Sequence, residues 1–257
     1  EIEARWVVLA TGAVPQALMA AGMCQRQSPS GVALRAYVKN AAMRERIKTL
    51  DIVWHRALKP GYGWIFPCGN DVYNIGAGVS QSHDETAGHK KGGTNLRDVY
   101  EAFLRVYEPA RALMDGGELL GDPKGAPLRC SLDGARDARP GLLVTGEAAG
   151  STYSFTGEGI GKAMETGMLA AQAVLDHRAD DVALCRAYEA ALQQLRTRFA
   201  LYRRAHIVNA QPWLADLLIW RARKSPRILR RMSGVLDETS NPGRLLTMRG
   251  MLRLFTE

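Results

Sequence analysis

LLVTGEAAGSTYSFTGEGIG, residues 142–161, is the stretch that decides the fold. Its first four residues are apolar or β-branched and stop at Gly146, which predicts a short buried strand ending in a turn. Three further glycines precede an apolar repeat with helical spacing, so we expect a helix to begin near Gly157. A strand, a glycine turn and a helix start together aim backbone N–H groups at an anionic or electron-rich ligand.

The stretch offers two contact points to such a ligand. The first is the turn formed by Gly146, Glu147, Ala148, Ala149 and Gly150; the second is the helix start formed by Thr156, Gly157, Glu158, Gly159 and Ile160. Glycines let a flat ring approach the backbone closely, and the helix dipole places partial positive charge beneath that ring. A reduced flavin carries negative charge in its pyrimidine ring, so a helix end of this kind would favour the reduced form.

The order of strand, GEAAG and TGEGI resembles the second flavin-binding motif of the geranylgeranyl reductase family, within the flavoproteins of the p-hydroxybenzoate hydroxylase fold. The resemblance implies that Glu147 binds the ribityl chain of FAD. It also implies that Gly157, Glu158, Gly159 and Ile160 lie against the isoalloxazine. The chain departs from the usual motif at Glu147, where the family prefers Asp, and at Ser154, where it prefers Pro. We expect each departure to weaken flavin binding without abolishing the pattern.

Two more segments carry the resemblance. Residues 5–13, RWVVLATGA, resemble the strand-and-ATG element of these flavoproteins, which implies that Thr11, Gly12 and Ala13 pass near the FAD diphosphate or ribose. Residues 61–67, GYGWIFP, resemble a segment of the family's antiparallel substrate domain. Tyr62, Trp64 and Phe66 alternate, so all three project from one face of a strand. An aromatic wall suits a long apolar substrate, although ordinary packing inside a sheet would give the same pattern.

These features predict an α/β (α+β) fold with three parts. We expect an incomplete FAD-binding Rossmann-like domain over 1–30 and 115–180, an inserted antiparallel β-sheet substrate domain over 31–114, and a helical region over 181–257. Strands are expected at 32–38, 51–58, 63–67 and 72–79, a loop at 80–94 and a helix at 96–113. No strand with a GxGxxG turn occurs in the 257 residues. We therefore expect the numbering to start inside a longer protein, and this chain alone to bind FAD poorly and to be inactive.

Two helical apolar stripes are expected to pack inward. The first comprises Ile160, Ala163, Met164, Met168, Ala171, Val174 and Leu175. The second comprises Leu184, Tyr188, Ala191, Leu192, Leu195, Phe199 and Tyr202.

The net charge of +8 is concentrated near the C-terminus, where residues 186–257 hold 14 Lys and Arg against 5 Asp and Glu. We expect either a solvated helical face or a peripheral contact with an anionic membrane through the basic C-terminal helices. No nucleic-acid-binding motif accompanies the charge, which argues against a nucleic-acid partner. The four cysteines are scattered without metal-ligand spacing, so we expect no metal site and reduced thiols in a cytoplasmic protein.

The leading functional hypothesis is an FAD- and NAD(P)H-dependent oxidoreductase that reduces carbon–carbon double bonds of an isoprenoid or a similar apolar substrate. No catalytic residue is assigned: His55 and Tyr62 have suitable side chains, but each is expected to be structural. The alternative within the same fold is a flavin monooxygenase or halogenase. The alternative from another class is a non-catalytic remnant, or a module that docks on a membrane or a partner.

Overall fold

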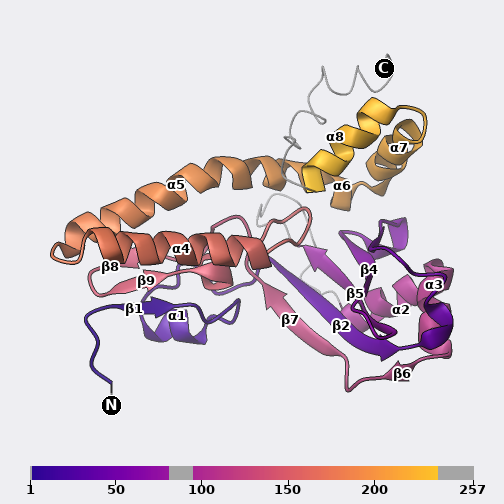
Figure 1. The fold of residues 1–257 in the computed structure, drawn as a ribbon, viewed down its shortest axis with the longest axis horizontal. Coiled ribbons are helices and arrows are strands. Elements are labelled where there is room, and N and C mark those ends of the chain that lie inside the picture. Colours follow the sequence, from indigo (N-terminus) through magenta and orange to yellow (C-terminus); the bar gives the residue numbers. More distant parts are fainter. Residues whose placement is uncertain (1, 81–94, 237–257) are drawn as a thin grey trace. The chain divides into compact units, whose positions relative to one another are not determined.

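The computed structural model describes residues 2–80 and 95–236, and within them the chain forms two compact units. The first unit comprises residues 1–29, 128–206 and 218–257, of which 2–29, 128–206 and 218–236 are described. The second comprises 30–127 and 207–217, of which 30–80, 95–127 and 207–217 are described. The expected loop at 80–94 therefore falls almost wholly outside the described residues. The fold class is the mixed α/β class that the sequence predicts (Figure 1).

The first unit holds a three-stranded sheet in the order β1 (Val7–Leu9), β9 (Leu142–Val144) and β8 (Ala138–Arg139). Strands β1 and β9 are parallel, and β8 is antiparallel to β9. A short helix, α1 (Gln16–Ala20), follows β1. Two long helices, α4 (Ile160–Asp176) and α5 (Asp181–Ala205), run side by side (Figure 1).

Helix α5 supplies much of the core of the first unit, as its stripe predicts. Leu184, Tyr188, Leu192, Leu195, Phe199 and Tyr202 are all buried. The Tyr188 hydroxyl donates a hydrogen bond of 2.7 Å to the carbonyl oxygen of Val144 and so ties α5 to β9. The ring of Tyr202 stacks on that of Tyr153 with 3.9 Å between centroids. Because this helix belongs to the core, residues 181–205 are not a separate C-terminal region.

Helix α4 corrects the sequence prediction about its buried face. The apolar stripe is exposed, with Ile160 at 83%, Met164 at 65% and Met168 at 72% of their full accessibility. The buried residues are instead Lys162, Thr166, Ala170 and Ala173. Thr166 explains the choice of face, because its hydroxyl accepts the N–H of Gly146 at 3.0 Å. The helix begins at Ile160 rather than Gly157, since Gly157 has a φ of +73°, outside the helical region.

The second unit is built on an antiparallel sheet in the order β3 (Asp51–Val53), β4 (Gly61–Pro67), β5 (Val72–Ser80), β2 (Gly31–Lys39) and β6 (Glu118–Leu119). Strand β7 (Lys124–Leu128) also pairs with β2. Because β6 and β7 join this sheet, the chain returns to the first unit near residue 128, not near 115 as the sequence suggested. Strand β3 is shorter than the 51–58 expected.

One face of this sheet is covered by α2 (Leu96–Val106), whose Phe103 ring lies against the backbone of Gly63. The helix expected over 96–113 is broken at Tyr107, and α3 (Glu108–Asp115) follows it. Pro109 accounts for the break, because it has no N–H to bond to the carbonyl one turn back. Within 2–80 and 95–236, no helix is both long and apolar enough to cross a membrane.

Candidate functional site

The glycine turn after β9 is the first part of the site. Residues 146–149 form a short 3-10 helix, η3 (Gly146–Ala149), and Gly146 and Gly150 have φ values of +64° and +86°. A Cβ atom on Gly150 would lie 2.9 Å from the backbone nitrogen of Asp133. Both glycines therefore hold backbone conformations that other residues rarely adopt, and Gly150 has no space for a side chain.

The second glycine turn lies beside the first. Strands β1 and β9 are parallel and in register, with Leu9 opposite Val144, and the N–H of Thr145 donates to the carbonyl oxygen of Leu9 at 3.0 Å. Thr11, Gly12 and Ala13 therefore follow β1 at the same edge of the sheet as Gly146 follows β9. Ligands of open α/β sheets bind outside the carboxyl ends of such strands.

Glu147 points its carboxylate back toward its own chain. Oε1 accepts the Thr152 hydroxyl at 3.1 Å, and the backbone N–H of Arg129 bonds to the same carboxylate. Burial raises the pKa of Glu147, and the two hydrogen bonds and the Arg129 charge partly offset that rise. A ligand hydroxyl that binds Glu147 therefore meets an acceptor already fixed in place.

Arg129 is a residue that the sequence analysis missed. Its side chain is completely buried, and its guanidinium donates to the carbonyl oxygens of Arg26, at 3.0 Å, and of Gly134. Its charge acts on Glu147. A single arginine between apolar residues at 127–130 is the only sequence signal, and such a pattern does not distinguish a buried arginine from an exposed one.

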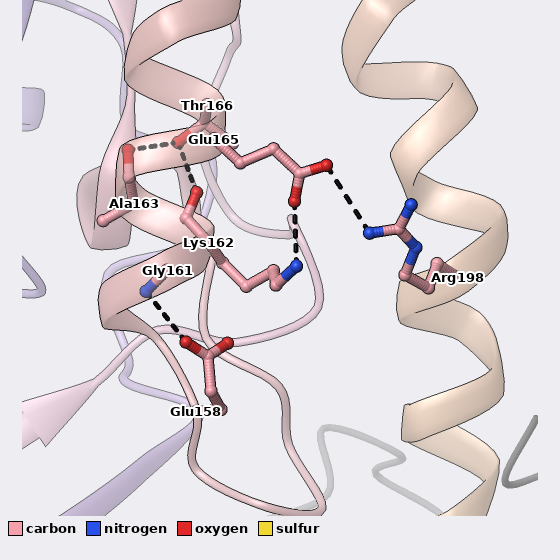
Figure 2. A network of polar contacts seen from close by, with 7 residues as sticks. All are labelled: Glu158, Gly161, Lys162, Ala163, Glu165, Thr166 and Arg198. Atoms are coloured by element: carbon pink, nitrogen blue, oxygen red, sulfur yellow. Dashed lines mark hydrogen bonds and ion pairs between the residues drawn. The ribbon is translucent and has the colours of Figure 1, made fainter. Parts of the chain in front are cut away.

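The helix start is the second half of the site (Figure 2). Glu158 Oε1 accepts the N–H of Gly161 at 2.8 Å, while Glu158 Oε2 is buried without a hydrogen-bond partner among the described residues. The preceding loop is closed by two backbone bonds, from Gly157 to the Tyr153 oxygen at 2.9 Å and from Tyr153 to the Glu158 oxygen at 2.8 Å. A Cβ on Gly159 would lie 2.5 Å from the Thr152 hydroxyl, so this glycine is required for packing.

Lys162 places a buried cation in the first turn of α4. Its Nζ lies 2.9 Å from Glu165 Oε2, the ion pair drawn in Figure 2. The same Nζ is 5.4 Å from the centroid of the Tyr153 ring. The other Glu165 oxygen is 3.5 Å from Nη1 of Arg198 on α5. A cation at the positive end of a helix is unfavourable by itself, and Glu165 compensates it. The sequence analysis did not single out Lys162 as part of the site.

The donors of this unit fit one side of a flavin. The first N–H groups of a helix have no carbonyl partner inside the helix, and at the start of α4 the N–H of Gly161 is held by Glu158. The Ser151 hydroxyl, in the completely buried residue after Gly150, has no hydrogen-bond partner among the described residues. These donors and the positive helix end suit an electron-rich ring with polar edges.

The predicted aromatic wall forms a ladder in the second unit. Tyr62, Trp64 and Phe66 project from one face of β4, with successive ring centroids 6.1 Å apart, and each is half-buried. Trp54 extends the ladder, its ring 5.9 Å from that of Tyr62. The indole N–H of Trp64 donates to Asn74 at 3.0 Å. Gly63 and Ile65 are buried on the opposite face of the strand.

His55 is engaged in local structure. Its Nδ1 accepts the N–H of Ala57 at 3.1 Å and so begins the short helix η2 (Arg56–Leu58). This cap is also the reason that the expected strand stops at Val53. Within the described residues, no group of three or more His, Cys, Asp or Glu side chains could hold a metal ion.

Comparison with known proteins places these features in a family, although no family model matches the chain. The digeranylgeranylglycerophospholipid reductase of Methanoculleus marisnigri is 36% identical over 113 residues, which are 44% of this chain and 25% of that protein. The menaquinone reductase of Mycobacterium tuberculosis is 30% identical over 187 residues, which are 69% of this chain and 42% of that protein. These matches support the geranylgeranyl reductase family of FAD-dependent oxidoreductases for this chain.

Solved structures agree with the fold of this family. A geranylgeranyl bacteriochlorophyll reductase-like protein from Thermoplasma acidophilum aligns with a TM-score of 0.61 and 20% identity, over 99% of this chain and 59% of that one. A flavin-dependent brominase variant aligns with a TM-score of 0.58 and 18% identity, over 81% of this chain and 53% of the brominase. At these identities the likeness concerns the fold alone. The chain spans between a quarter and about two fifths of the length of the two reductases named above.

Proposed function

We propose that this chain is part of an FAD-dependent reductase that uses NAD(P)H to reduce carbon–carbon double bonds in an isoprenoid or a similar apolar substrate. The observation that carries the proposal is the pair of glycine turns at the carboxyl ends of parallel β1 and β9, followed by the glycine-flanked start of α4 at Ile160. The relatives in the geranylgeranyl reductase family are named for reductase activity.

In this proposal Glu147 binds the ribityl hydroxyls, and Thr11, Gly12 and Ala13 lie near the diphosphate or ribose. Residues 156–160 lie against the isoalloxazine. FAD, when bound, supplies the hydride for the double bond. The protein's task is to position the ring and to stabilise negative charge on it, for which the positive end of α4 is suited.

The aromatic ladder is proposed to hold the substrate. Four half-buried rings in a row, from Trp54 to Phe66, provide apolar area with few polar groups, as an extended hydrocarbon chain requires. The names of the two relatives denote lipids with long isoprenoid chains, which such a surface could accommodate.

The test uses the full-length protein that contains this chain. We expect a bound flavin spectrum and, under anaerobic conditions, NADPH oxidation that depends on a polyprenyl acceptor and adds hydrogen to it. A Glu147→Ala variant should lose FAD occupancy, whereas Trp64→Ala should keep FAD and raise the KM for the acceptor. Oxygen-dependent turnover without alkene reduction would instead support a monooxygenase or halogenase. A protein without any flavin would support a non-catalytic role.

A further inference from the structure

An open depression lies within the first unit, where the end of α7 (Pro212–Ala222) meets α8 (Pro226–Leu236). Its volume is about 510 Å³, and it is lined by Ile219, Ala222, Arg223, Lys224, Pro226, Leu229 and Met232. Five of these seven side chains are apolar. Leu229 is 54% exposed and Ile219 38% exposed, so these two apolar side chains face water instead of packing in the core.

Trp220 stands beside this depression with cations around its ring. It is 49% exposed, with Lys224 Nζ 4.4 Å and the Arg221 guanidinium 5.6 Å from the ring centroid. An exposed tryptophan with cations at its ring combines an apolar body with a positively charged surround. That combination suits the boundary between lipid headgroups and acyl chains.

The charge of this region has a single sign. Residues 218–236 contain six basic residues and no acidic one; the six are Arg221, Arg223, Lys224, Arg227, Arg230 and Arg231. A cluster of this size on an amphipathic helix attracts anionic lipid. The region is also firmly attached to its unit, because Ile228 and Val235 are buried and the Tyr202 hydroxyl donates to the Val235 oxygen at 2.8 Å.

We propose that the basic apolar surface formed by Ile219, Trp220, Arg223, Lys224, Arg227, Leu229 and Arg230 docks on an anionic lipid bilayer. Trp220 and Leu229 enter the boundary between headgroups and acyl chains, and the cations lie over the phosphates. Charge complementarity selects an anionic occupant, and the exposed apolar groups select a bilayer over a soluble polyanion. Docking does not rest on the proposed reductase activity, since it requires no FAD and no turnover.

Vesicle binding measures the proposal directly. The full chain should co-sediment with vesicles of phosphatidylcholine and phosphatidylglycerol and leave pure phosphatidylcholine vesicles unbound. Replacing Arg223 and Lys224 by Gln should weaken binding about fivefold for each cation removed. Arg105→Gln with Lys48→Gln is the matched control, since it removes the same two residue types from exposed positions in the second unit.

The apolar contribution is tested separately. Leu229→Ser should weaken vesicle binding about tenfold. Leu50→Ser, at a position that is 65% exposed in the second unit, should leave it unchanged. Circular dichroism of each variant confirms that it is folded.

Three results would overturn the proposal. The first is equal binding to neutral and anionic vesicles, or binding to neither. The second is binding to anionic vesicles that Leu229→Ser does not change, because the surface would then recognise charge alone. The third is affinity for a duplex DNA oligonucleotide equal to that for the vesicles, which would assign the surface to a soluble polyanion.

Discussion

Replacing Lys162 by Met tests whether the buried ion pair at the start of α4 stabilises the first unit. The Lys162 side chain is 9% exposed, and its Nζ is 2.9 Å from a Glu165 oxygen. Removing one partner of a fully buried pair costs roughly 3–5 kcal/mol, because the other charge is left without compensation. Glu165 is 31% exposed and retains Arg198 as a second partner, which lowers the expected cost to about 1–2 kcal/mol.

The Tyr153 ring adds a smaller contribution. The lysine ammonium lies 5.4 Å from its centroid, and such a cation–π contact is worth about 0.5–1 kcal/mol. Methionine preserves the apolar stem of the lysine, so packing changes little. We therefore expect Lys162→Met to lower the free energy of unfolding of the first unit by about 2 kcal/mol.

The assay is unfolding in urea, measured by hydrogen exchange of peptides from α4 and α5. This readout reports the stability of the first unit separately from that of the second. Arg198→Met is the matched control, since this arginine is 45% exposed and 3.5 Å from Glu165, and it should cost at most about 0.5 kcal/mol. A double-mutant cycle with Glu165→Gln should give a coupling above about 1 kcal/mol for Lys162. A Lys162→Met variant as stable as Arg198→Met would refute the reasoning.

Three other predictions concern stability. Burial raises the pKa of Glu147, so the folded state favours the protonated carboxyl, and the free energy of unfolding falls as pH rises from the ordinary value of 4.5 through the folded-state pKa. Glu147→Gln should therefore be more stable than the parent at neutral pH. A pH series of melting curves should show this difference vanish in acid. Gly150→Ala should lower the free energy of unfolding in urea more than Gly12→Ala does. Both positions have positive φ, which strains alanine by about 1–2 kcal/mol, but only at Gly150 would the new Cβ also meet the backbone of Asp133. Equal losses would contradict the packing described for this turn. Tyr188→Phe should lower the free energy of unfolding by about 1–3 kcal/mol, because the Val144 carbonyl loses the hydroxyl that donates to it. Tyr100→Phe loses only a contact to the Met114 sulfur and should cost less. Thermal unfolding of both variants measures the difference.

The sequence predicts the structural features that are determined by residues close together along the chain. Alternation in 32–38 indicates a strand, the spacing from Leu184 to Tyr202 indicates a buried helical stripe, and the glycines of 146–150 indicate a tight turn; the structure has all three. These features depend on local sterics and on a period that a single segment displays.

What the sequence does not reveal depends on partners that are distant along the chain. Periodicity shows that 160–175 is a helix, but the buried face is set by Thr166 bonding to Gly146 and by Lys162 pairing with Glu165. The burial of Arg129 likewise depends on carbonyl groups of Arg26 and Gly134. The β7 segment has no alternating pattern, so only its pairing with β2 assigns it to the sheet.

The parallel pairing of β1 with β9 has a consequence for the order of folding. These strands are separated by roughly 130 residues, a long loop to close before any contact is gained. Residues 30–127, the larger part of the second unit, lie inside that loop, and the two ends of this segment are adjacent, since Gly125 of β7 lies beside Ala33 of β2. If the sheet formed by 30–127 folds first, the remaining loop shrinks to roughly 35 flexible residues, which lowers the closure cost by about 1 kcal/mol. We therefore expect the inserted sheet to act as a folding template that brings the two glycine turns of the site together.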